Sequence, residues 1–409
     1  MTAPLSDVSR PSVLLYEPRI EGHHLSYLKF IAEDLENAGF LLTLAVDMSP
    51  AIFSRIREQL GDLLERVRLL PVCDDSGRRT HASPVDSVAA CAISAGAKIA
   101  FLNNFDDIAS SLLRRAAGGQ LPPLTLRGRL GGIYLRPRFL AGRGLSPNRW
   151  LKWLGFRRLL NDGWFRQLLF LDRALPKQVK ASWPDAPVHF LPDPYPDDFR
   201  ADCSQARQHL GVPADRSVFL FYGGAYRRKG LYFAVEALLA LTAETRVFLL
   251  FAGHQPEEAQ TRRGLEQLAR QGRARVIDRY VSDAEEKMLF AAADFVLLPY
   301  IRHFGSSGVL SRAAGAGKPV IASDEELVGQ VVRERGLGLL FPSGNAPALA
   351  RALLQALDPS PQQAESWRTA LRAFAGQCSR VAFRKALLST FGARPRPEYA
   401  AASFEQSRR

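Results

Sequence analysis

Short apolar runs alternate repeatedly with longer amphipathic stretches along this chain. The alternation begins at Val13 with VLLYEP and continues with HLSYLKFIAEDLENAG, LLTLAVD and AIFSRIREQLGDLLERV. Strand-helix-strand order with short turns produces parallel strands that are covered by helices. The pattern therefore predicts a Rossmann-like α/β domain, which continues through KIAFLNN, GGIYLRP, a long basic helix at about 149–166 and VHFLPDP.

A proline-rich segment divides the chain. PDPYPDDF, which starts at Pro192, contains three prolines, and proline stiffens the backbone and removes a hydrogen-bond donor. Beyond it the alternation restarts with SVFLFYGG, GLYFAVEALLAL, RVFLLFAG, a helix at about 257–271, DFVLLPY and KPVIAS. The length of 409 residues also favours two domains, because a typical domain has about 150 residues.

These observations predict an α/β protein made of two Rossmann-like domains, with a ligand in a cleft between them where parallel strands end. The predicted parts are an N-terminal domain at 12–192, a second domain at 200–375, a C-terminal helix at 376–392 that can pack back on the first domain, and a disordered tail at 393–409.

The composition excludes several classes of protein. The four cysteines are scattered without a C-x-x-C pair, which indicates neither a disulfide framework nor a zinc site. The first ten residues lack the apolar core of a signal peptide, and no run of about 18 apolar residues occurs. We therefore expect a cytoplasmic protein that can meet a membrane only from its surface, at the inner face.

The positive charge is concentrated in one segment. The chain has a net charge of +13, and residues 114–180 contain 15 Lys and Arg but only two acids, so this segment accounts for the whole excess. Within it, residues 136–166 combine bases with Trp150, Trp153 and Trp164, a mixture that suits anionic lipid headgroups. A solvated structural helix and another polyanionic partner remain alternatives, because the bases do not separate onto one helical face. No nucleic-acid-binding motif accompanies the charge, so a nucleic acid partner is not expected.

Two turns of the second domain contain the residue types that bind phosphate. In YGGAYRRKGL a strand ends before a double glycine and a cluster of bases, where glycines let the backbone approach a ligand and cations neutralise its charge. In HFGSSGVLSR a Gly/Ser turn opens a helix, whose first amides can hold an anion. A surface turn and an ordinary N-cap are the respective alternatives. The candidate phosphate-binding residues are Gly223, Gly224, Arg228, Lys229, Gly305, Ser306, Ser307 and Gly308.

The first domain also places polar residues where its strands are predicted to end. Histidine after the first strand can hydrogen-bond a phosphate or a hydroxyl, or can simply cap the helix. Amides and hydroxyls after later strands suit sugar hydroxyls, although Asn and Asp are also common in turns. The candidate acceptor-side residues are Gly22, His23, His24, Asn103, Asn104, Asp106, Tyr134 and Arg136. No catalytic nucleophile can be named, and His24 is a weak catalytic candidate.

The order and spacing of FLFYGGAYRRKGLYFAVEAL, FLLFAGH, AADFVLLPY, GAGKPVIAS and GLGLLFPSGN resemble the donor domain of retaining glycosyltransferases of family 4. The resemblance is strong over 210–345 and loose over 47–188. It implies the GT-B fold and transfer of a sugar, with retention, from a nucleotide diphosphate sugar to a glycan or lipid-linked acceptor. The nucleotide sugar is then a co-substrate, and no tightly bound cofactor is expected.

The sequence departs from the family's pattern at its carboxylates. Lys229 matches the family's lysine, but the usual arginine before it is replaced by Gly224. The two glutamates that contact the donor sugar and ribose are replaced by Phe304 and Arg312, which become the candidate donor ribose or sugar residues, and a third falls near Gln330. An active divergent enzyme, a degenerate module that binds nucleotide or glycan as a scaffold, and another chemistry such as phosphorolysis remain open.

No D-x-D sequence occurs, so we expect no metal site. Cations and helix ends would then stabilise the leaving diphosphate. The resulting prediction is a metal-independent glycosyltransferase, an enzyme of polysaccharide or glycolipid biosynthesis.

Overall fold

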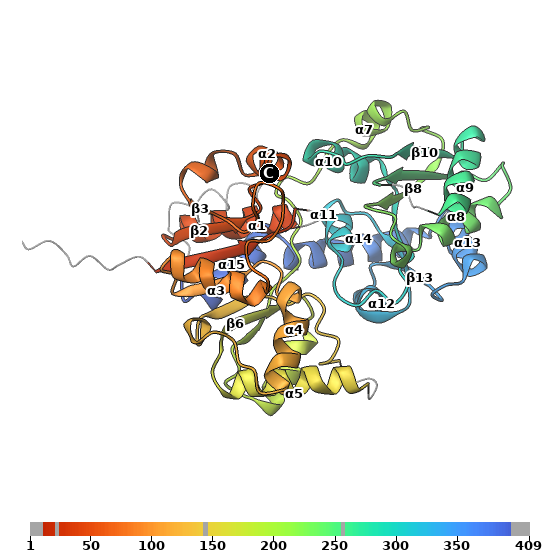
Figure 1. The fold of residues 1–409 in the computed structure, drawn as a ribbon. Coiled ribbons are helices and arrows are strands. Elements are labelled where there is room, and N and C mark those ends of the chain that lie inside the picture. The colour runs from red at the N-terminus through yellow and green to blue at the C-terminus, as the bar shows by residue number, and fades with distance from the viewer. Residues whose placement is uncertain (1–10, 21–23, 142–145, 255–257, 394–409) are drawn as a thin grey trace, which may run out of the picture. The chain divides into compact units, whose positions relative to one another are not determined.

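A computed structural model describes residues 11–20, 24–141, 146–254 and 258–393 (Figure 1). The chain divides into two compact units, the first formed by residues 1–191 and 384–409 and the second by residues 192–383. Each unit is a parallel sheet flanked by helices. The predicted architecture of two Rossmann-like α/β domains is confirmed.

Unit 1 contains a seven-stranded sheet in the order β3-β2-β1-β4-β5-β6-β7. All of its strand pairs are parallel. Inner strands such as Ile99–Leu102 are fully buried and apolar because helices cover a parallel sheet, whereas the edge strand Arg68–Pro71 is exposed at both ends. The strands of unit 1 are β1 (Ser12–Glu17), β2 (Leu41–Val46), β3 (Arg68–Pro71), β4 (Ile99–Leu102), β5 (Leu130–Ile133), β6 (Phe165–Phe170) and β7 (Val188–Phe190).

The helices of unit 1 include the predicted basic helix, but it is shorter than expected. The prediction extended it to residue 166, whereas the structure ends it at Asn161, and Arg166 lies in β6. Gly163 adopts a left-handed φ of 70°, which ends the helical path. The helices are α1 (His24–Asn37), α2 (Pro50–Leu60), α3 (Pro84–Ser94), α4 (Asp106–Ala117), α5 (Pro147–Asn161) and α6 (Ala174–Ser182), with short 3-10 turns at Gly61–Glu65 and Leu124–Leu126.

The last helix, α15 (Arg380–Thr390), carries the chain back to unit 1. Its Arg384 Nε lies 2.7 Å from the buried carboxylate of Asp34 on α1. Just beyond the helix, Phe391 packs against Phe40 and Phe101. Residues 394–409, where the disordered tail is predicted, lie outside the described part of the chain.

Unit 2 contains a six-stranded sheet in the order β10-β9-β8-β11-β12-β13, again with parallel pairs only. Its strands are β8 (Ser217–Tyr222), β9 (Val247–Ala252), β10 (Ala274–Ile277), β11 (Phe295–Leu298), β12 (Val320–Ser323) and β13 (Gly338–Phe341). Its helices are α7 (Cys203–Leu210), α8 (Leu231–Leu239), α9 (Ala259–Arg270), α10 (Asp283–Ala292), α11 (Gly308–Gly315), α12 (Glu326–Arg335), α13 (Ala346–Gln355) and α14 (Pro361–Gln377), with a 3-10 turn at Arg227–Lys229.

The strand orders fix where a ligand can bind within each unit. In an open parallel sheet, ligands bind at the carboxyl ends of the two strands where the order reverses direction. In unit 1 these strands are β1 and β4, and in unit 2 they are β8 and β11. Most of the candidate residues lie in the loops that follow these four strands or in the helices that those loops enter, whereas Tyr134 and Arg136 follow β5.

None of the helices in the described residues is both long enough and apolar enough to cross a membrane. All four cysteines are free thiols. No group of three or more His, Cys, Asp or Glu side chains that could hold a metal gathers within the described ranges.

Candidate functional site

The loop after β8 lies directly against the loop after β11. At Gly230, which has a φ of 72°, an added Cβ would lie only 1.8 Å from the carbonyl oxygen of Pro299. The backbone N–H of Ile301 donates to the carbonyl of Arg228 across the same contact, at 3.0 Å. Both the close approach and the left-handed conformation require glycine at 230. The two predicted phosphate turns therefore form one site.

Side chains from the two turns also bond to each other. Lys229 Nζ donates to the hydroxyl of Tyr300 at 2.8 Å, and that hydroxyl lies 3.0 Å from Ser307 Oγ. Arg228 Nη1 lies 2.7 Å from Nδ1 of His303, whose Nε2 lies 3.1 Å from the carbonyl oxygen of Ser306. Because a carbonyl only accepts and a guanidinium only donates, these partners require His303 to carry its proton on Nε2. These bonds hold the two cations, Arg228 and Lys229, near the amino end of α11.

Tyr300 anchors this arrangement to the sheet. Its carbonyl oxygen accepts hydrogen bonds from the hydroxyls of Ser323, at 2.6 Å, and Ser343, at 3.3 Å. Ser323 is the last residue of β12 and Ser343 lies just beyond β13, so the turn after β11 is tied to both of these strands. Sequence reasoning missed Tyr300 and His303, although both stand directly beside the predicted Gly/Ser turn.

Arg227, the third cation of the turn after β8, bonds to groups outside this arrangement. Arg227 Nη1 pairs with Glu258 at 2.7 Å, and its guanidinium lies over the ring of Tyr232. Arg228 and Lys229 are therefore the bases that serve the site.

The amino end of α11 has free backbone amides, as the prediction required, and lacks the ordinary serine cap that was the alternative. Ser307 occupies the N-cap position, but its side chain makes no capping hydrogen bond to the first turn. Its hydroxyl bonds to Tyr300 instead. The first amides of α11 thus lack a side-chain cap, and the positive end of the helix faces the turn.

Two carboxylates from distant segments of the chain bond to residues of this turn and of α11. Ser306 Oγ donates to Asp193 Oδ2 at 2.8 Å. Arg312 Nε donates to Glu286 Oε1 on α10 at 2.6 Å, and Arg312 Nη1 donates to the carbonyl of Gly308 at 3.2 Å. The side chains of Arg312 and Glu286 are only 13% and 6% exposed. Arg312 is therefore part of a buried ion pair.

The groups around this pair raise the pKa values of Arg312 and Tyr222. Burial opposes the charge on Arg312, but Glu286, Tyr222 and Asp193 outweigh it and raise the pKa of the guanidinium. Burial, followed by the charge of Glu286, raises the pKa of Tyr222 well above its usual value. At neutral pH the site therefore contains a charged Arg312 guanidinium beside a neutral Tyr222 phenol.

Two other candidate positions are less directly involved. Phe304 is half-buried, and its backbone N–H donates to the carbonyl of Arg302. Gln330 lies on α12, where its Nε2 donates to Glu334.

In unit 1 a buried carboxylate organises the ends of β1 and β4. Glu17 Oε2 lies 2.6 Å from His24 Nδ1 and accepts from Asn103 Nδ2 at 2.6 Å. Asn103 Nδ2 also donates to the carbonyl of His24 at 2.9 Å. Burial lowers the pKa of His24, but the hydrogen bond and charge of Glu17 outweigh it, so its pKa is raised. Gly22 and His23, which were also predicted here, lie outside the described residues.

Two oxygen atoms in this cluster are buried without a partner. Within the described residues, neither Asn103 Oδ1 nor Asp107 Oδ2 accepts a hydrogen bond. The other oxygen of Asp107 pairs with Arg19 at 3.0 Å. Sequence reasoning missed Glu17 and Asp107. The signal for Glu17 was an acid at the last position of an otherwise apolar strand.

The remaining predicted acceptor-side residues have structural partners. Asn104 Oδ1 accepts from the N–H of Asp106 at the start of α4. Asp106 Oδ2 accepts from the N–H groups of Leu135 and Arg136, which fixes the turn after β5. Tyr134 is only 3% exposed and packs among aromatic rings, and burial raises its pKa well above the usual value.

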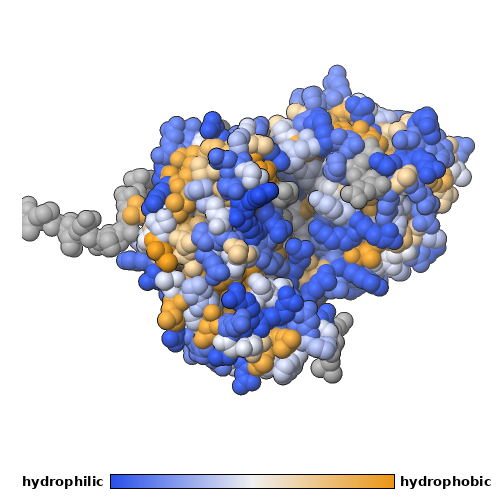
Figure 2. All heavy atoms as spheres, viewed as in Figure 1, coloured by the Kyte–Doolittle hydropathy of each residue, from blue (hydrophilic) through white to orange (hydrophobic). Residues whose placement is uncertain are grey.

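The basic helix α5 is packed on one side and open on the other. At Gly155 an added Cβ would lie 1.8 Å from the carbonyl oxygen of Leu113, so α4 and α5 touch there. Trp150 on this helix is 58% exposed, whereas Trp164, beyond the end of the helix, is buried in the core. Figure 2 shows hydrophobic and hydrophilic residues interspersed in the region where Figure 1 labels α4 and α5.

Comparison with known proteins gives a family for part of the chain. Residues 216–359 match the family model described as glycosyl transferases group 1. A phosphatidyl-myo-inositol mannosyltransferase from Mycobacterium leprae (strain TN) is 32% identical over 159 residues, which cover 38% of this chain and 41% of that relative. The alignment therefore spans about two fifths of the relative's length.

Solved structures match over nearly the whole chain. Sucrose-phosphate synthase from Thermosynechococcus elongatus has a TM-score of 0.68 at 17% identity, covering 96% of this chain and all of that one. Anabaena Alr3699/HepE, solved in complex with UDP and glucose, has a TM-score of 0.67 at 15% identity, covering 94% and 100%. Identities this low show the fold alone, and that fold is the GT-B type.

The matched range 216–359 contains both turns that form the site around Lys229 and Tyr300. This part of the chain thus matches the glycosyl transferases group 1 family, within a chain that has the GT-B fold.

Proposed function

We propose that this protein is a glycosyltransferase that moves a sugar, with retention, from a nucleotide diphosphate sugar to a glycan or lipid-linked acceptor. The observation that carries the proposal is the Lys229–Tyr300–Ser307 chain of hydrogen bonds. It joins a cation-bearing turn to an uncapped helix end, at the strand pair where a parallel sheet binds its ligand. We assign the protein to the family-4 type on the resemblance of its donor domain.

The chemistry of the transfer follows from this arrangement. When the bond between the sugar and the diphosphate breaks, negative charge accumulates on the departing phosphate oxygens. Lys229, Arg228 and the amino end of α11 are fixed in advance around one position and can stabilise that charge. Because these groups carry the neutralising charge, and because the sequence has no D-x-D, the proposed reaction needs no metal ion. The presence of UDP and glucose in the Anabaena structure supports a nucleoside diphosphate as the leaving group.

The acceptor is proposed to meet the cluster around Glu17 in unit 1. Asn103 Oδ1 and Asp107 Oδ2 are buried acceptors that a hydroxyl-rich molecule would satisfy, and leaving such atoms unpaired costs about 1–3 kcal/mol each. His24, oriented by Glu17, is the candidate for handling the acceptor's proton. The name of the Mycobacterium leprae relative supports a lipid-linked acceptor.

The same structure supports a second candidate function. Arg312 and Phe304 stand where the resemblance places the glutamates for ribose and sugar, and Arg312 is committed to Glu286. A module that binds a nucleotide or a glycan without turnover, as a scaffold subunit, would also preserve the phosphate turns and lose the donor carboxylates.

A transfer assay with a panel of nucleotide sugars and lipid or glycan acceptors separates the two. The enzyme hypothesis expects turnover that Lys229→Ala abolishes, that EDTA leaves unchanged, and that the exposed control Lys385→Ala preserves. Tight nucleotide binding without turnover of any donor would establish the binding module instead.

The proposed location is the cytoplasm, with peripheral contact at the inner membrane face through α5. Arg157 and Arg158 are exposed on this helix together with Trp150. Each base near an anionic surface contributes about 1 kcal/mol. Neutralising both arginines should weaken co-sedimentation with phosphatidylserine vesicles by roughly 30-fold, or about 2 kcal/mol. Binding that is absent at the start, or unchanged in the variant, would remove the membrane contact.

A further inference from the structure

Unit 2 contains a cavity that lies away from the donor turns. It has a volume of about 280 Å³ and is lined by the end of α11 with the turn that follows it, by the end of α10, by one face of α14 and by the segment before α7. The turn after α11 ends at Lys318 and Pro319, where the chain enters β12. The cavity is therefore at the amino edge of the parallel sheet, whereas the donor turns are at its carboxyl edge.

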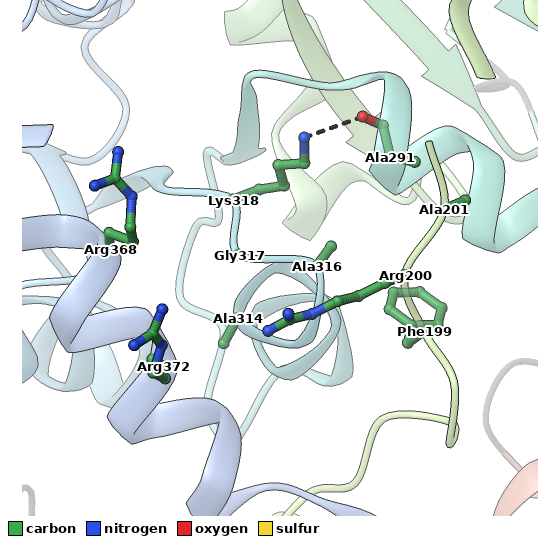
Figure 3. Close-up of a pocket in the computed structure, with 10 residues that line it drawn as sticks. All are labelled: Phe199, Arg200, Ala201, Ala291, Ala314, Ala316, Gly317, Lys318, Arg368 and Arg372. Atoms are coloured by element: carbon green, nitrogen blue, oxygen red, sulfur yellow. Dashed lines mark hydrogen bonds between the residues drawn. The ribbon is translucent and has the colours of Figure 1, made fainter. Parts of the chain in front are cut away.

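The lining of this cavity is strongly cationic. It includes Arg200, Lys318, Arg368 and Arg372 but no acidic residue. In Figure 3 the guanidinium of Arg200 points across the end of α11 toward the α14 side, where Arg368 and Arg372 lie. The Lys318 ammonium points instead to the carbonyl of Ala291, to which it donates at 3.0 Å.

The protein's own groups neutralise only part of this charge. Arg368 pairs with Glu365 on the same helix. Arg200 and Arg372 have no ion-pair partner in the part of the chain that the structure describes. The carboxyl end of α11 contributes roughly half a negative charge, which offsets a fraction of one arginine. The cavity thus retains a positive excess.

The state of Lys318 supports the same conclusion. Burial lowers the pKa of its ammonium, and the neighbouring Arg207 lowers it further against the effects of Cys203 and Asp294. A charged group kept in an unfavourable environment is stabilised by an anion that binds beside it.

We propose that this cavity is a second anion site, which binds a phosphate or diphosphate group. Arginine forks bind phosphate oxygens in pairs, and several such forks in one cavity suit a doubly charged ligand. At about 280 Å³ the cavity is below the usual range for drug-sized ligands, so it suits inorganic phosphate, pyrophosphate or a small sugar phosphate. The site is separate from the donor turns, and it stands whether or not the protein transfers sugars.

Isothermal titration at fixed ionic strength tests the site, with inorganic phosphate, pyrophosphate and glucose 6-phosphate as the three probes. The cavity variant is Arg200→Gln/Arg372→Gln, and the control Arg270→Gln/Arg351→Gln removes the same charge from exposed positions of unit 2 outside the cavity. We expect saturable binding in the wild type, at least a tenfold loss in the cavity variant and no loss in the control. The preferred probe identifies whether the ligand is a free phosphate or a phosphorylated sugar.

The donor variant Lys229→Ala separates the two sites, because it should retain the binding that the cavity variant loses. Equal losses in the cavity and control variants, or a loss that Lys229→Ala alone reproduces, would overturn the proposal. Hydrogen exchange gives an independent reading on the unmodified chain. Pyrophosphate should protect amides at 361–377 in α14, and the absence of protection there contradicts the site.

Discussion

Replacing Glu286 by glutamine should destabilise unit 2 strongly, although it changes only one atom of the side chain. The carboxylate is 6% exposed and holds Arg312, itself 13% exposed, at 2.6 Å. Removing one partner of a buried ion pair leaves the other charge uncompensated, which typically costs about 3–5 kcal/mol. Arg312 keeps its bond to the carbonyl of Gly308 and the nearby charge of Asp193. We therefore expect the lower end, about 3 kcal/mol.

A matched variant shows whether burial is the cause. Asp358 also pairs with an arginine, Arg246, at 2.8 Å, but these side chains are 82% and 55% exposed. Asp358→Asn should cost at most about 1 kcal/mol. The double variant Glu286→Leu/Arg312→Met removes both charges and should recover most of the stability that Glu286→Gln loses.

Urea unfolding can be followed in unit 2 separately. Of the five tryptophans, Trp367 is the one that lies within residues 192–383, so its resonance in 19F NMR of fluorotryptophan-labelled protein reports on this unit. The reasoning fails if Glu286→Gln and Asp358→Asn shift the midpoint of the Trp367 transition equally. It also fails if the double variant is less stable than Glu286→Gln alone.

Two further predictions concern His24 and Gly230. Glu17 raises the folded-state pKa of His24, so their pairing stabilises the fold fully below a pH of about 6.5, and this stabilisation is lost as the pH rises through the folded-state pKa. The unfolding free energy of Glu17→Gln should therefore approach that of the wild type at high pH. A constant difference between the two from pH 5 to 9 contradicts the pairing. Gly230→Ala places a Cβ 1.8 Å from the carbonyl oxygen of Pro299, whereas Gly336→Ala at a similar left-handed φ of 65° meets open space. Urea midpoints should show Gly230→Ala to be worse by about 1–3 kcal/mol, and equal losses would mean that the two turns do not touch.

The fold could be predicted because its determinants are local. Apolar runs such as FLFY and FVLL alternate with amphipathic stretches, and the turns that follow them stand next to them in sequence. The predicted length of α5 was wrong because basic and aromatic residues continue past the end of the helix without a change in composition. Its true end depends on the backbone conformation of Gly163, and the same aromatic and basic residue types also suit the strand that follows.

The partners within the site could not be predicted, because they depend on tertiary contacts. Glu285 and Glu286 are adjacent acids in the first turn of α10. Glu285 completes the capping box with Ser282, whereas Glu286, one position further around the helix, is buried against Arg312. No local feature of the sequence distinguishes their roles.

The role of Asp193 also depends on a tertiary contact. This residue belongs to a linker whose other acids, Asp197 and Asp198, are exposed, yet its carboxylate accepts a hydrogen bond from Ser306 in the donor turn. Both carboxylates are remote in sequence from the groups they bind, and only the fold brings them together: Asp193 and Ser306 are separated by 113 residues, and Glu286 and Arg312 by 26.

We propose that the two turns around Lys229 bind a nucleoside diphosphate. Equilibrium titration of UDP and GDP into the wild type, Lys229→Ala and the exposed control Lys385→Ala tests it most directly. A charge-assisted hydrogen bond is worth about 1.5–3 kcal/mol, so Lys229→Ala should weaken binding roughly 10- to 150-fold, and Lys385→Ala should leave it unchanged. A wild type that binds neither nucleotide, or a Lys229→Ala variant that binds as tightly as the wild type, would contradict the account.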